Sequence, residues 1–368
     1  MHADEIAVDA SRAGVAARTG TEWYSFELIR AMIAVEDRPP LRLYHRGAPP
    51  PELDGPAVSH QHIQQPRLWT HLGLSRAMRH DRPAALYVPS HVLPLVHPAV
   101  SVVTVHDLGY LAEPDAHPAS TRRMLDLTTR WNARTAREII AISGQTRDDL
   151  VRHYRVDPAK ISVIHSGVDH QRFRPLDVDT VQAVISRLGI NQPYLFFLST
   201  VQPRKNVERL VEAFESLEPG LTLVIAGSSG WLSEPIEARI AGSSASDRIR
   251  RLGVVADADV PALYNGAEAF VLPSLFEGFG MGVLEAMACG CPVVTSSRSS
   301  LPEVAGGAAI LIDPFDIRSI RDGIVAAIKP QRRAELVAAG IERARNFTWQ
   351  QTATATLDVI RKAIDGRS

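Results

Sequence analysis

Short runs of β-branched and aliphatic residues alternate with helical segments along most of this sequence, and that alternation restricts the possible fold most strongly. The first half has such runs at 99–107, 138–143 and 160–167. The second half has them at 194–200, 221–227, 248–255, 267–274, 291–297 and 307–313. Strands that are apolar along their whole length are typical of parallel sheets covered by helices on both faces. The sequence therefore predicts an α/β protein with parallel sheets.

The length of the chain indicates more than one domain. A chain of 368 residues is too long for one ordinary core and suits two domains of about 150–200 residues each. The stretch 165–193 is polar, contains prolines and has a single helical segment, which is typical of a connector. We predict an N-terminal domain over 1–170, a linker over 171–192, a C-terminal domain over 193–347 and a final helix capped by Thr348.

Composition and charge exclude several classes of function. The formal net charge is −1, so no general attraction to nucleic acid or anionic lipid is expected. No apolar run reaches the roughly 18 residues that a membrane-spanning helix needs, and the first residues, with Asp4 and Glu5, lack a signal-peptide core. The two cysteines, Cys289 and Cys291, are expected to be small buried residues rather than a metal site. We expect a cytoplasmic protein that binds no nucleic acid.

The glycine-rich segment "EGFGMG", 277–282, offers accessible backbone at a predicted helix start. Gly278, Gly280 and Gly282 leave N–H groups approachable, and the helix expected over 281–288 would present its positive end to a phosphate. A dinucleotide-binding fingerprint has G-x-G-x-x-G and a later acidic residue. This chain has G-x-G-x-G, followed later by "SSRSS". Arg298 could meet a 2′-phosphate, so these residues alone leave a dinucleotide open.

Two glutamates flank the glycines. Glu277 precedes them, and Glu285 falls early in the expected helix, where a carboxylate is also favoured by the helix dipole alone. The acid and nucleophile of a glycosidase must lie on opposite sides of one bond. Two carboxylates on one turn and its helix favour contacts with different parts of one extended ligand.

The longer run "LPSLFEGFGMGVLEAMACGCPVVTSSRSSLPEVAGGAAILIDPFD", 272–316, resembles the donor-binding segment of retaining family 4 glycosyltransferases. Its E-x7-E signature falls on Glu277 and Glu285. The likeness extends through 105–108, 142–150, 166–175 and 199–214 and is greatest to the mannosyltransferase-B-like group. It implies a GT-B fold, with two Rossmann-like doubly wound domains facing each other across a cleft and the terminal helix, 348–368, crossing back to the N-terminal domain.

The resemblance implies a division of labour between the domains. The N-terminal domain would bind the acceptor, and the C-terminal domain would bind a nucleotide-sugar. The catalytic residues implied are Glu277, at the hydroxyls of the transferred sugar, and His106, at the reaction centre. The donor-binding residues implied are Gly20, Arg204, Lys205, Val255, Phe279, Gly280, Met281, Gly282 and Glu285. Arg204 and Lys205 follow a strand, where they can neutralise a diphosphate; without the motif they would indicate only a solvated pair at a helix start.

The reaction implied is transfer of a hexose with retention at the anomeric carbon. The leaving phosphate can itself accept the proton of the acceptor hydroxyl, so the protein supplies positioning and charge stabilisation. The D-x-D spacing of Asp257 and Asp259 is expected to be helix capping, so no metal and no cofactor are predicted. The donor expected from the subgroup is GDP-mannose, with a UDP- or TDP-sugar open, and the acceptor is a glycan or lipid-linked saccharide of cell-surface polysaccharide synthesis. The alternatives are a GT-B-fold nucleotide-sugar epimerase and an inactive nucleotide-sugar-binding subunit.

The acceptor side is less defined. The segment 67–80 is expected to be helical, with arginines beside Leu72 and Leu74. It could make a weak peripheral contact with the inner face of a membrane, or it could be a packing helix with a solvated basic face. The segments 88–98 and 108–118 are the expected acceptor-facing loops.

Overall fold

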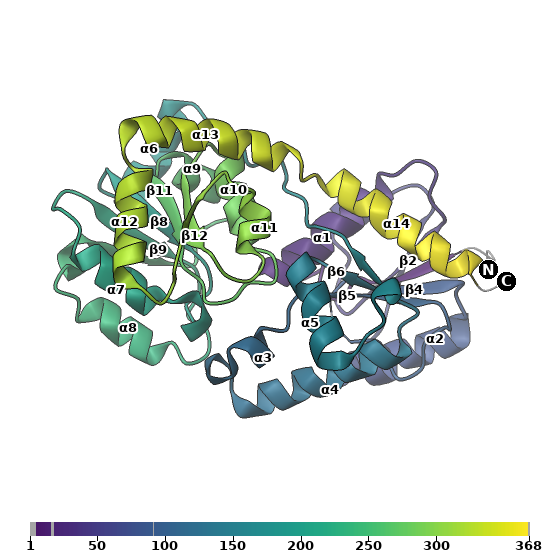
Figure 1. The fold of residues 1–368 in the computed structure, drawn as a ribbon. Helices are drawn as coiled ribbons and strands as arrows, with labels where there is room; N and C mark the ends of the chain where they lie inside the picture. Colours follow the sequence, from purple (N-terminus) through teal and green to yellow (C-terminus); the bar gives the residue numbers. More distant parts are fainter. Residues whose placement is uncertain (1–4, 16–17, 91, 367–368) are drawn as a thin grey trace. The chain divides into compact units, whose positions relative to one another are not determined.

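The computed structural model describes residues 5–15, 18–90 and 92–366 of the chain (Figure 1). It divides into two units. Unit 1 comprises Met1–Leu108, Arg123–Gly167 and Thr348–Ser368, and unit 2 comprises Gly109–Arg122 and Val168–Phe347. The segment 109–122, placed by sequence in the N-terminal domain, belongs to unit 2. The expected linker, 171–192, lies within unit 2 and contains one helix.

Unit 1 is built on a parallel sheet with the strand order β3-β2-β1-β4-β5-β6-β7. Its strands are β1 (Ile6–Asp9), β2 (Leu41–His45), β3 (Val58–His62), β4 (Ala85–Val88), β5 (Ser101–Val105), β6 (Glu138–Ala141) and β7 (Ile161–Val163). The central strands β1, β4 and β5 are buried along their whole length. The order reverses between β1 and β4, and ligands bind at such a point in open parallel sheets.

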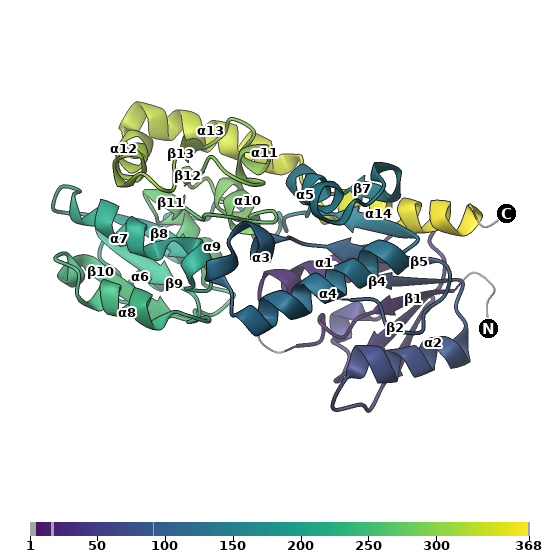
Figure 2. The same ribbon diagram turned by 60° about the horizontal axis from the view of Figure 1, so that its bottom comes forward.

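Helices cover both faces of this sheet (Figure 2). The α-helices are α1 (Gly20–Ile33), α2 (Ser75–Asp81), α4 (Ala119–Thr135), α5 (Gly144–Tyr154) and α14 (Trp349–Asp365). Shorter helical segments are η1 (Pro51–Leu53), the π-helix η2 (Trp69–Leu74) and η4 (Pro158–Lys160). Helix α14 packs beside α1, where the rings of Trp349 and Tyr24 meet edge to face with centroids 5.6 Å apart. The predicted return of the terminal helix is therefore confirmed.

Unit 2 has a second parallel sheet, with the order β10-β9-β8-β11-β12-β13. Its strands are β8 (Tyr194–Leu198), β9 (Thr222–Ala226), β10 (Ile249–Gly253), β11 (Ala269–Leu272), β12 (Val293–Ser296) and β13 (Ile310–Ile312). The order reverses between β8 and β11. Both sheets thus have the doubly wound arrangement expected from the sequence.

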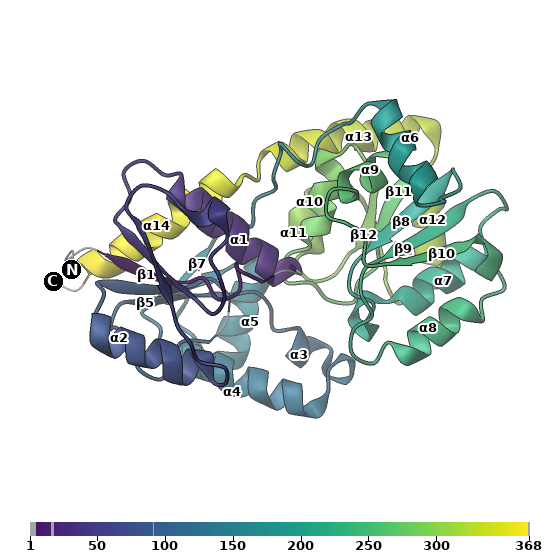
Figure 3. The ribbon, with the colours of Figure 1, turned by 180° about the vertical axis from the view of Figure 1, so that it is seen from behind.

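The helices of unit 2 also form two layers (Figure 3). Helices α7 (Val207–Glu215), α8 (Glu234–Ala241) and α12 (Ile317–Ala327) pack together in one layer. The other layer contains α6 (Val178–Arg187), α9 (Val260–Asn265), α10 (Met281–Ala288), α11 (Leu301–Ala305) and α13 (Pro330–Arg345). The remaining segments are α3 (Gly109–Ala112), η3 (Pro114–Ala116), η5 (Pro203–Lys205) and η6 (Ser246–Arg248).

The local predictions hold with one exception. Each strand expected from a short apolar run is present, and Thr348 caps α14 by accepting a hydrogen bond from the amide of Gln351, 3.2 Å. Both cysteines are buried and free. The capping role expected of Asp259 is wrong: its side chain makes no cap bond to α9 and instead pairs with Arg187, 2.5 Å. This ion pair takes the carboxylate away from the helix amides.

Among the described residues, no helix combines the length and the apolar character needed to cross a membrane.

Candidate functional site

In unit 2, two segments of the chain lie where the strand order reverses, one after β8 and one after β11. The chain leaves β8 and enters η5, which contains Arg204 and Lys205. It leaves the neighbouring strand β11 and enters the loop that contains Glu277. Because parallel strands end at the same edge of a sheet, residues that are 72 positions apart come together here.

The centre of this site is a buried ion pair. Lys205 Nζ lies 2.6 Å from Glu277 Oε1, and both side chains are about one-tenth exposed or less. Arg204 Nη1 lies 3.3 Å from the other carboxylate oxygen and donates to the Phe276 carbonyl, 2.6 Å. Ser274 Oγ also donates to Glu277 Oε1, 2.7 Å. The carboxylate is thus held on both oxygens.

The charges in this cluster do not cancel. Burial alone raises the pKa of Glu277, but Lys205 and Arg204 outweigh burial, so the pKa lies below its ordinary value. Two cations on one ionised carboxylate leave a surplus of one positive charge. Among the described residues, Arg204 Nε and Gln202 Oε1 are buried with no hydrogen-bond partner. A surplus charge with an unused donor favours binding of an anion.

Serines hold the backbone of the glycine-rich loop. The amide of Glu277 donates to Ser299 Oγ, 3.0 Å, and Ser300 Oγ donates to the carbonyls of Glu277 and Phe279, at 2.9 and 3.1 Å. The ring of Phe279 is buried and meets the ring of Phe347, with centroids 6.0 Å apart. The side chain of Phe279 is therefore used in packing within the unit.

Helix α10 begins directly after this loop. Gly280 stands before its first residue with φ of +95°, a conformation that favours glycine. Met281 is the first helical residue, and Gly282 lies so close to the neighbouring helix α9 that an added Cβ would be 3.2 Å from Tyr264 Oη. The amide of Val283 donates to the Gly280 carbonyl, 2.9 Å, so the first two amides of α10, of Met281 and Gly282, are the ones that can donate to a ligand.

Glu285 lies one turn further along α10. Tyr264 Oη donates to Glu285 Oε2, 3.1 Å, and burial raises the pKa of this carboxyl above its ordinary value. Val255 is half-buried in the segment that follows β10, the edge strand of the sheet. These residues extend the site along the same sheet edge, away from the Lys205–Glu277 pair.

In unit 1, the predicted residues Gly20 and His106 lie at the reversal between β1 and β4. Gly20 is the first residue of α1, and His106 follows β5. The ring of His106 packs against Tyr24 of α1 with centroids 4.7 Å apart. His106 Nε2 lies 2.8 Å from the Pro89 carbonyl, which can only accept, so this nitrogen carries a proton. Burial lowers the pKa of His106, so neutral His106 offers Nδ1 as an acceptor.

The structure thus assembles Arg204, Lys205 and Glu277 in direct contact. It places Phe279, Gly280, Met281, Gly282 and Glu285 along the adjoining loop and helix. Sequence reasoning missed Ser274, Tyr264, Ser299 and Ser300. Ser274, Ser299 and Ser300 lie inside the run 272–316 that carries the resemblance, whereas Tyr264 lies outside it and is tied to the site only by the fold. Among the described residues, no three His, Cys, Asp or Glu side chains are grouped as they would be around a metal ion.

Comparisons with known families match both parts of the chain. Residues 19–172 match Glycosyltransferase Family 4, and residues 182–347 match Glycosyl transferases group 1. An O-antigen chain mannosyltransferase B from Escherichia coli is 28% identical over 368 residues, which cover 93% of this chain and 96% of that protein. A D-inositol 3-phosphate glycosyltransferase from Salinispora tropica is 31% identical over 298 residues, which cover 74% of this chain and 60% of that protein.

Solved structures show the same fold. Sucrose-phosphate synthase from Thermosynechococcus elongatus superposes with a TM-score of 0.79 at 21% identity, covering 99% of this chain and 100% of that one. HepE from Anabaena, in complex with UDP-glucose, superposes with a TM-score of 0.75 at 17% identity, again covering 99% and 100%. The predicted GT-B fold is therefore confirmed.

Proposed function

This chain belongs to the group 1 glycosyltransferases, and on that premise we propose that it transfers a hexose from a nucleotide-sugar to a glycan or lipid-linked acceptor, with retention at the anomeric carbon. The proposed donor is GDP-mannose, and the proposed setting is the synthesis of cell-surface polysaccharide in the cytoplasm. The name of the E. coli relative, an O-antigen chain mannosyltransferase, supports the sugar and the setting.

The observation that carries the proposal is the surplus positive charge beside Glu277. A nucleoside diphosphate brings about two negative charges, and Arg204 and Lys205 stand at the edge of the sheet where such ligands bind. Arginine can donate two parallel hydrogen bonds to phosphate, and lysine supplies a compact charge. The start of α10 adds backbone donors. The pyrophosphate is proposed to lie over these groups.

The carboxylates then contact the two ends of the donor. Glu277, whose pKa is lowered, is ionised at neutral pH and can accept hydrogen bonds from the hydroxyls of the transferred sugar. Glu285 is proposed to accept from the ribose. The backbone around Val255 is proposed to contact the base. In unit 1, His106 is proposed to accept a hydrogen bond from the sugar, and the amides near Gly20 to donate to the leaving phosphate.

The transfer itself exchanges one bond for another. The bond from the anomeric carbon to the phosphate oxygen breaks, and the acceptor oxygen bonds to the same face of that carbon. The acceptor proton passes to the departing phosphate, so no protein carboxylate has to attack. Arg204 and Lys205 stabilise the charge that develops on the phosphate. The reaction is proposed to need no metal.

A weak contact with a membrane is part of the proposal for the acceptor side. Leu68 and Leu72 are 64% and 52% exposed at the start of the helical segment that continues into α2. Trp69 and Leu74, in the same segment, are buried and attach it to the unit. The segment therefore has a packing face as well as an exposed apolar one.

A thermal-shift panel tests the donor. GDP-, UDP-, ADP- and TDP-sugars are added separately, and the cognate donor should raise the melting temperature most, because ligands stabilise the folded state by mass action. Equal, negligible shifts with all of them would contradict the proposal. Incubation with the cognate donor alone then separates the alternatives: an epimerase would change the sugar without an acceptor.

Metal independence has its own test. Transfer should continue in EDTA, because Arg204 and Lys205 already supply the positive charge at the phosphate. Loss of activity in EDTA with recovery on adding manganese would overturn this part of the proposal.

A further inference from the structure

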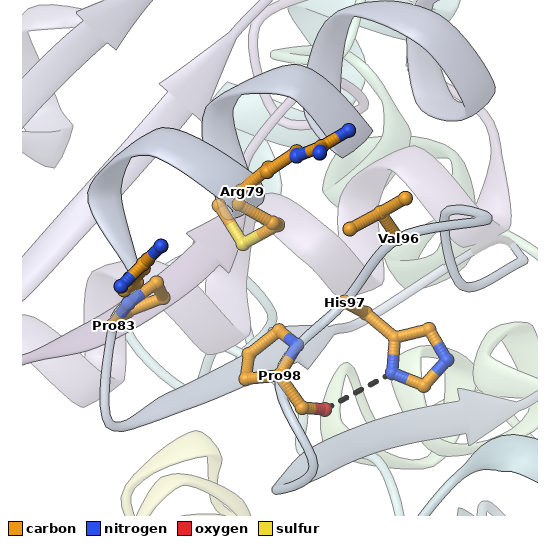
Figure 4. A pocket seen from close by; sticks show the side chains of 7 residues that line it. Arg79, Pro83, Val96, His97 and Pro98 are labelled. Atoms are coloured by element: carbon orange, nitrogen blue, oxygen red, sulfur yellow. Dashed lines mark hydrogen bonds between the residues drawn. The ribbon is translucent and has the colours of Figure 1, made fainter.

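A pocket of about 390 Å³ opens at the amino ends of β4 and β5 in unit 1 (Figure 4). This is the edge of the sheet opposite to the one that carries Gly20 and His106. The residues that line it are Met78, Arg79, Arg82, Pro83, Val96, His97 and Pro98. Its volume lies within the range of small-molecule sites, which begins at about 300 Å³. None of these residues belongs to the proposed transfer site.

Two chain segments form the walls. One is the end of α2 with the turn into β4, and the other is the loop that enters β5. The amide of Val96 donates to Ser75 Oγ at the start of α2, 3.1 Å, which ties the two walls together. Pro83 and Pro98 restrict the backbone on either side. The pocket is therefore formed by anchored segments before any ligand binds.

The charge in the pocket is positive and has no counterion. Arg79 and Arg82 are exposed, and among the described residues neither guanidinium has a hydrogen-bond or ion-pair partner. The lining residues include no carboxylate. Asp81, which lies between the two arginines in sequence, is buried and accepts from Tyr44 Oη, 2.8 Å. The whole chain has a formal charge of −1, so this positive cluster is a local feature.

Arg82 has a backbone conformation that is unusual for arginine, as Arg155 has at the end of α5. Arg82 ends α2 in a left-handed conformation, with φ of +46° and ψ of +55°, and its amide donates to the Met78 carbonyl. Glycine or asparagine is usual at such a helix end. Arginine is less suited to this conformation than either, and its side chain lines the pocket.

His97 is held in place at the wall of the pocket. Its Nδ1 lies 3.0 Å from the Pro98 carbonyl, which can only accept, so Nδ1 carries the proton, and the other ring nitrogen lies on the far side of the ring from Arg79 and Pro83 (Figure 4). Met78, Val96 and the two prolines supply apolar surface. The pocket thus combines two guanidinium groups with apolar walls.

We propose that this pocket binds a phosphate group that is attached to a small apolar or uncharged body. Guanidinium groups match phosphate oxygens in shape and charge. The phosphate comes either from a soluble phosphate ester or from the headgroup of an anionic lipid. The inference goes beyond sugar transfer and is tested without donor or acceptor.

Binding is measured on the full chain with two kinds of probe. Inorganic phosphate and glycerol 3-phosphate are titrated by calorimetry. Sedimentation with phosphatidylcholine vesicles, with and without an equal part of phosphatidylglycerol, tests the lipid source. Saturable binding of the soluble phosphates identifies a soluble ligand, and binding only to vesicles with phosphatidylglycerol identifies a headgroup. Absence of both would overturn the proposal.

Variants separate the pocket from a diffuse positive surface. Arg79→Ala and Arg82→Asn should each weaken binding about tenfold, because each removes a charge-assisted hydrogen bond. Arg76→Ala, on the same helix but outside the pocket, removes the same charge and should change binding by less than about twofold. Val96→Trp should block binding by filling the pocket without a change of charge. Equal losses from Arg76→Ala and Arg79→Ala, or unchanged binding in Val96→Trp, would contradict a specific site.

Discussion

At the scale of single residues, the state of Glu277 depends on its two neighbours. A buried carboxyl without a counterion would be neutral, because burial disfavours the charged form. Lys205 at 2.6 Å and Arg204 at 3.3 Å keep Glu277 ionised, and Ser274 fixes the oxygen that faces Lys205. The same contact holds both cations at the end of β8 in the absence of a ligand. Glu277 therefore orders the phosphate-binding cations as well as presenting an acceptor to the sugar.

Replacement of the lysine should weaken binding of the nucleoside diphosphate. We expect Lys205→Ala to cost about 1.5–3 kcal/mol of binding free energy, the value of a charge-assisted hydrogen bond. It should also lower the melting temperature, because Glu277 loses its nearest counterion. Titration calorimetry with the free nucleoside diphosphate measures the first effect. Lys329→Ala, an exposed lysine of the same unit, is the matched control, and an affinity equal to that control would remove Lys205 from the site.

Replacement of Glu277 should lower turnover rather than affinity for the nucleoside diphosphate. Glu277→Gln keeps a side chain of the same shape and removes the negative charge beside two cations, so affinity for the nucleoside diphosphate should stay the same or rise. Turnover should fall about 100-fold, as it does when a group that stabilises a transition state is lost. Steady-state kinetics separate the two quantities. Glu285→Gln should instead weaken nucleoside binding, and an unchanged kcat in Glu277→Gln would exclude it from the reaction.

At the scale of elements, the turn between β11 and α10 depends on Gly280. Its φ is +95°, and an added Cβ would lie 2.7 Å from Leu301 Cδ2 of α11. The backbone conformation therefore favours glycine, and any larger residue would also require the Leu301 side chain to shift. Any shift of this turn would move the first amides of α10, which the proposed function assigns to the donor.

The steric part of this requirement can be measured separately. Gly280→Ala should destabilise the protein by more than Gly307→Ala. Gly307 also has a positive φ, +85°, but a Cβ added there would meet nothing within 4 Å. Gly307→Ala therefore measures the cost of the left-handed backbone alone, about 1 kcal/mol or more, without a steric contact. Denaturant unfolding gives the loss of unfolding free energy for each variant. Equal losses would show that the Leu301 side chain moves aside without an energetic cost.

The pairing of β2 with β3 brings two histidines together and makes stability depend on pH. His45 is 1% exposed, and its Nε2 lies 3.0 Å from His60 Nδ1. Burial, with the nearby His60 and His62, lowers the pKa of His45 from 6.5 to about 4. The unfolded chain therefore takes up this proton first as the pH falls. Stability should decline from about pH 6.5 to about pH 4 and then level off for this group.

His45→Gln should flatten that decline, because glutamine can still bond to His60 but does not titrate. Urea unfolding at a series of pH values measures the slope. His153→Gln, an exposed histidine on α5, is the control. A slope that is the same in both variants would show that His45 does not contribute to the acid limb.

The sequence predicted β5 to β13, since apolar runs are a strong signal. It did not identify β1 to β4: β1 and β4 are buried along their whole length but only four residues long, and β3, "VSHQH", is polar and largely exposed. At the site, Arg204, Lys205 and Glu277 were recognisable from a known motif. Ser299, Ser300 and Tyr264 were not, because their bonds to the loop and to Glu285 arise only when distant segments pack.

At the scale of the whole molecule, both units use the same sheet topology and each has one reversal of strand order. The chain passes between the units at residues 108, 122, 167 and 347. The passages at 167 and 347 follow from changes in the sequence pattern. The polar, proline-containing stretch 165–193 lies at the first, and the Thr348-capped final helix begins at the second. The inclusion of 109–122 in unit 2 does not follow from such a change, because its two short helical segments and the first turn of α4 are too short to show a periodicity that assigns them to either core.

The central claim, that the donor lies at the carboxyl edge of the unit 2 sheet, is tested most directly by hydrogen exchange. Amides are compared with and without the nucleotide-sugar that the thermal-shift panel selects. We expect slower exchange over 202–206 and 274–285 and no change over 76–83, at the opposite edge of the other sheet. Protection confined to other segments, with 202–206 and 274–285 unchanged, would contradict the claim.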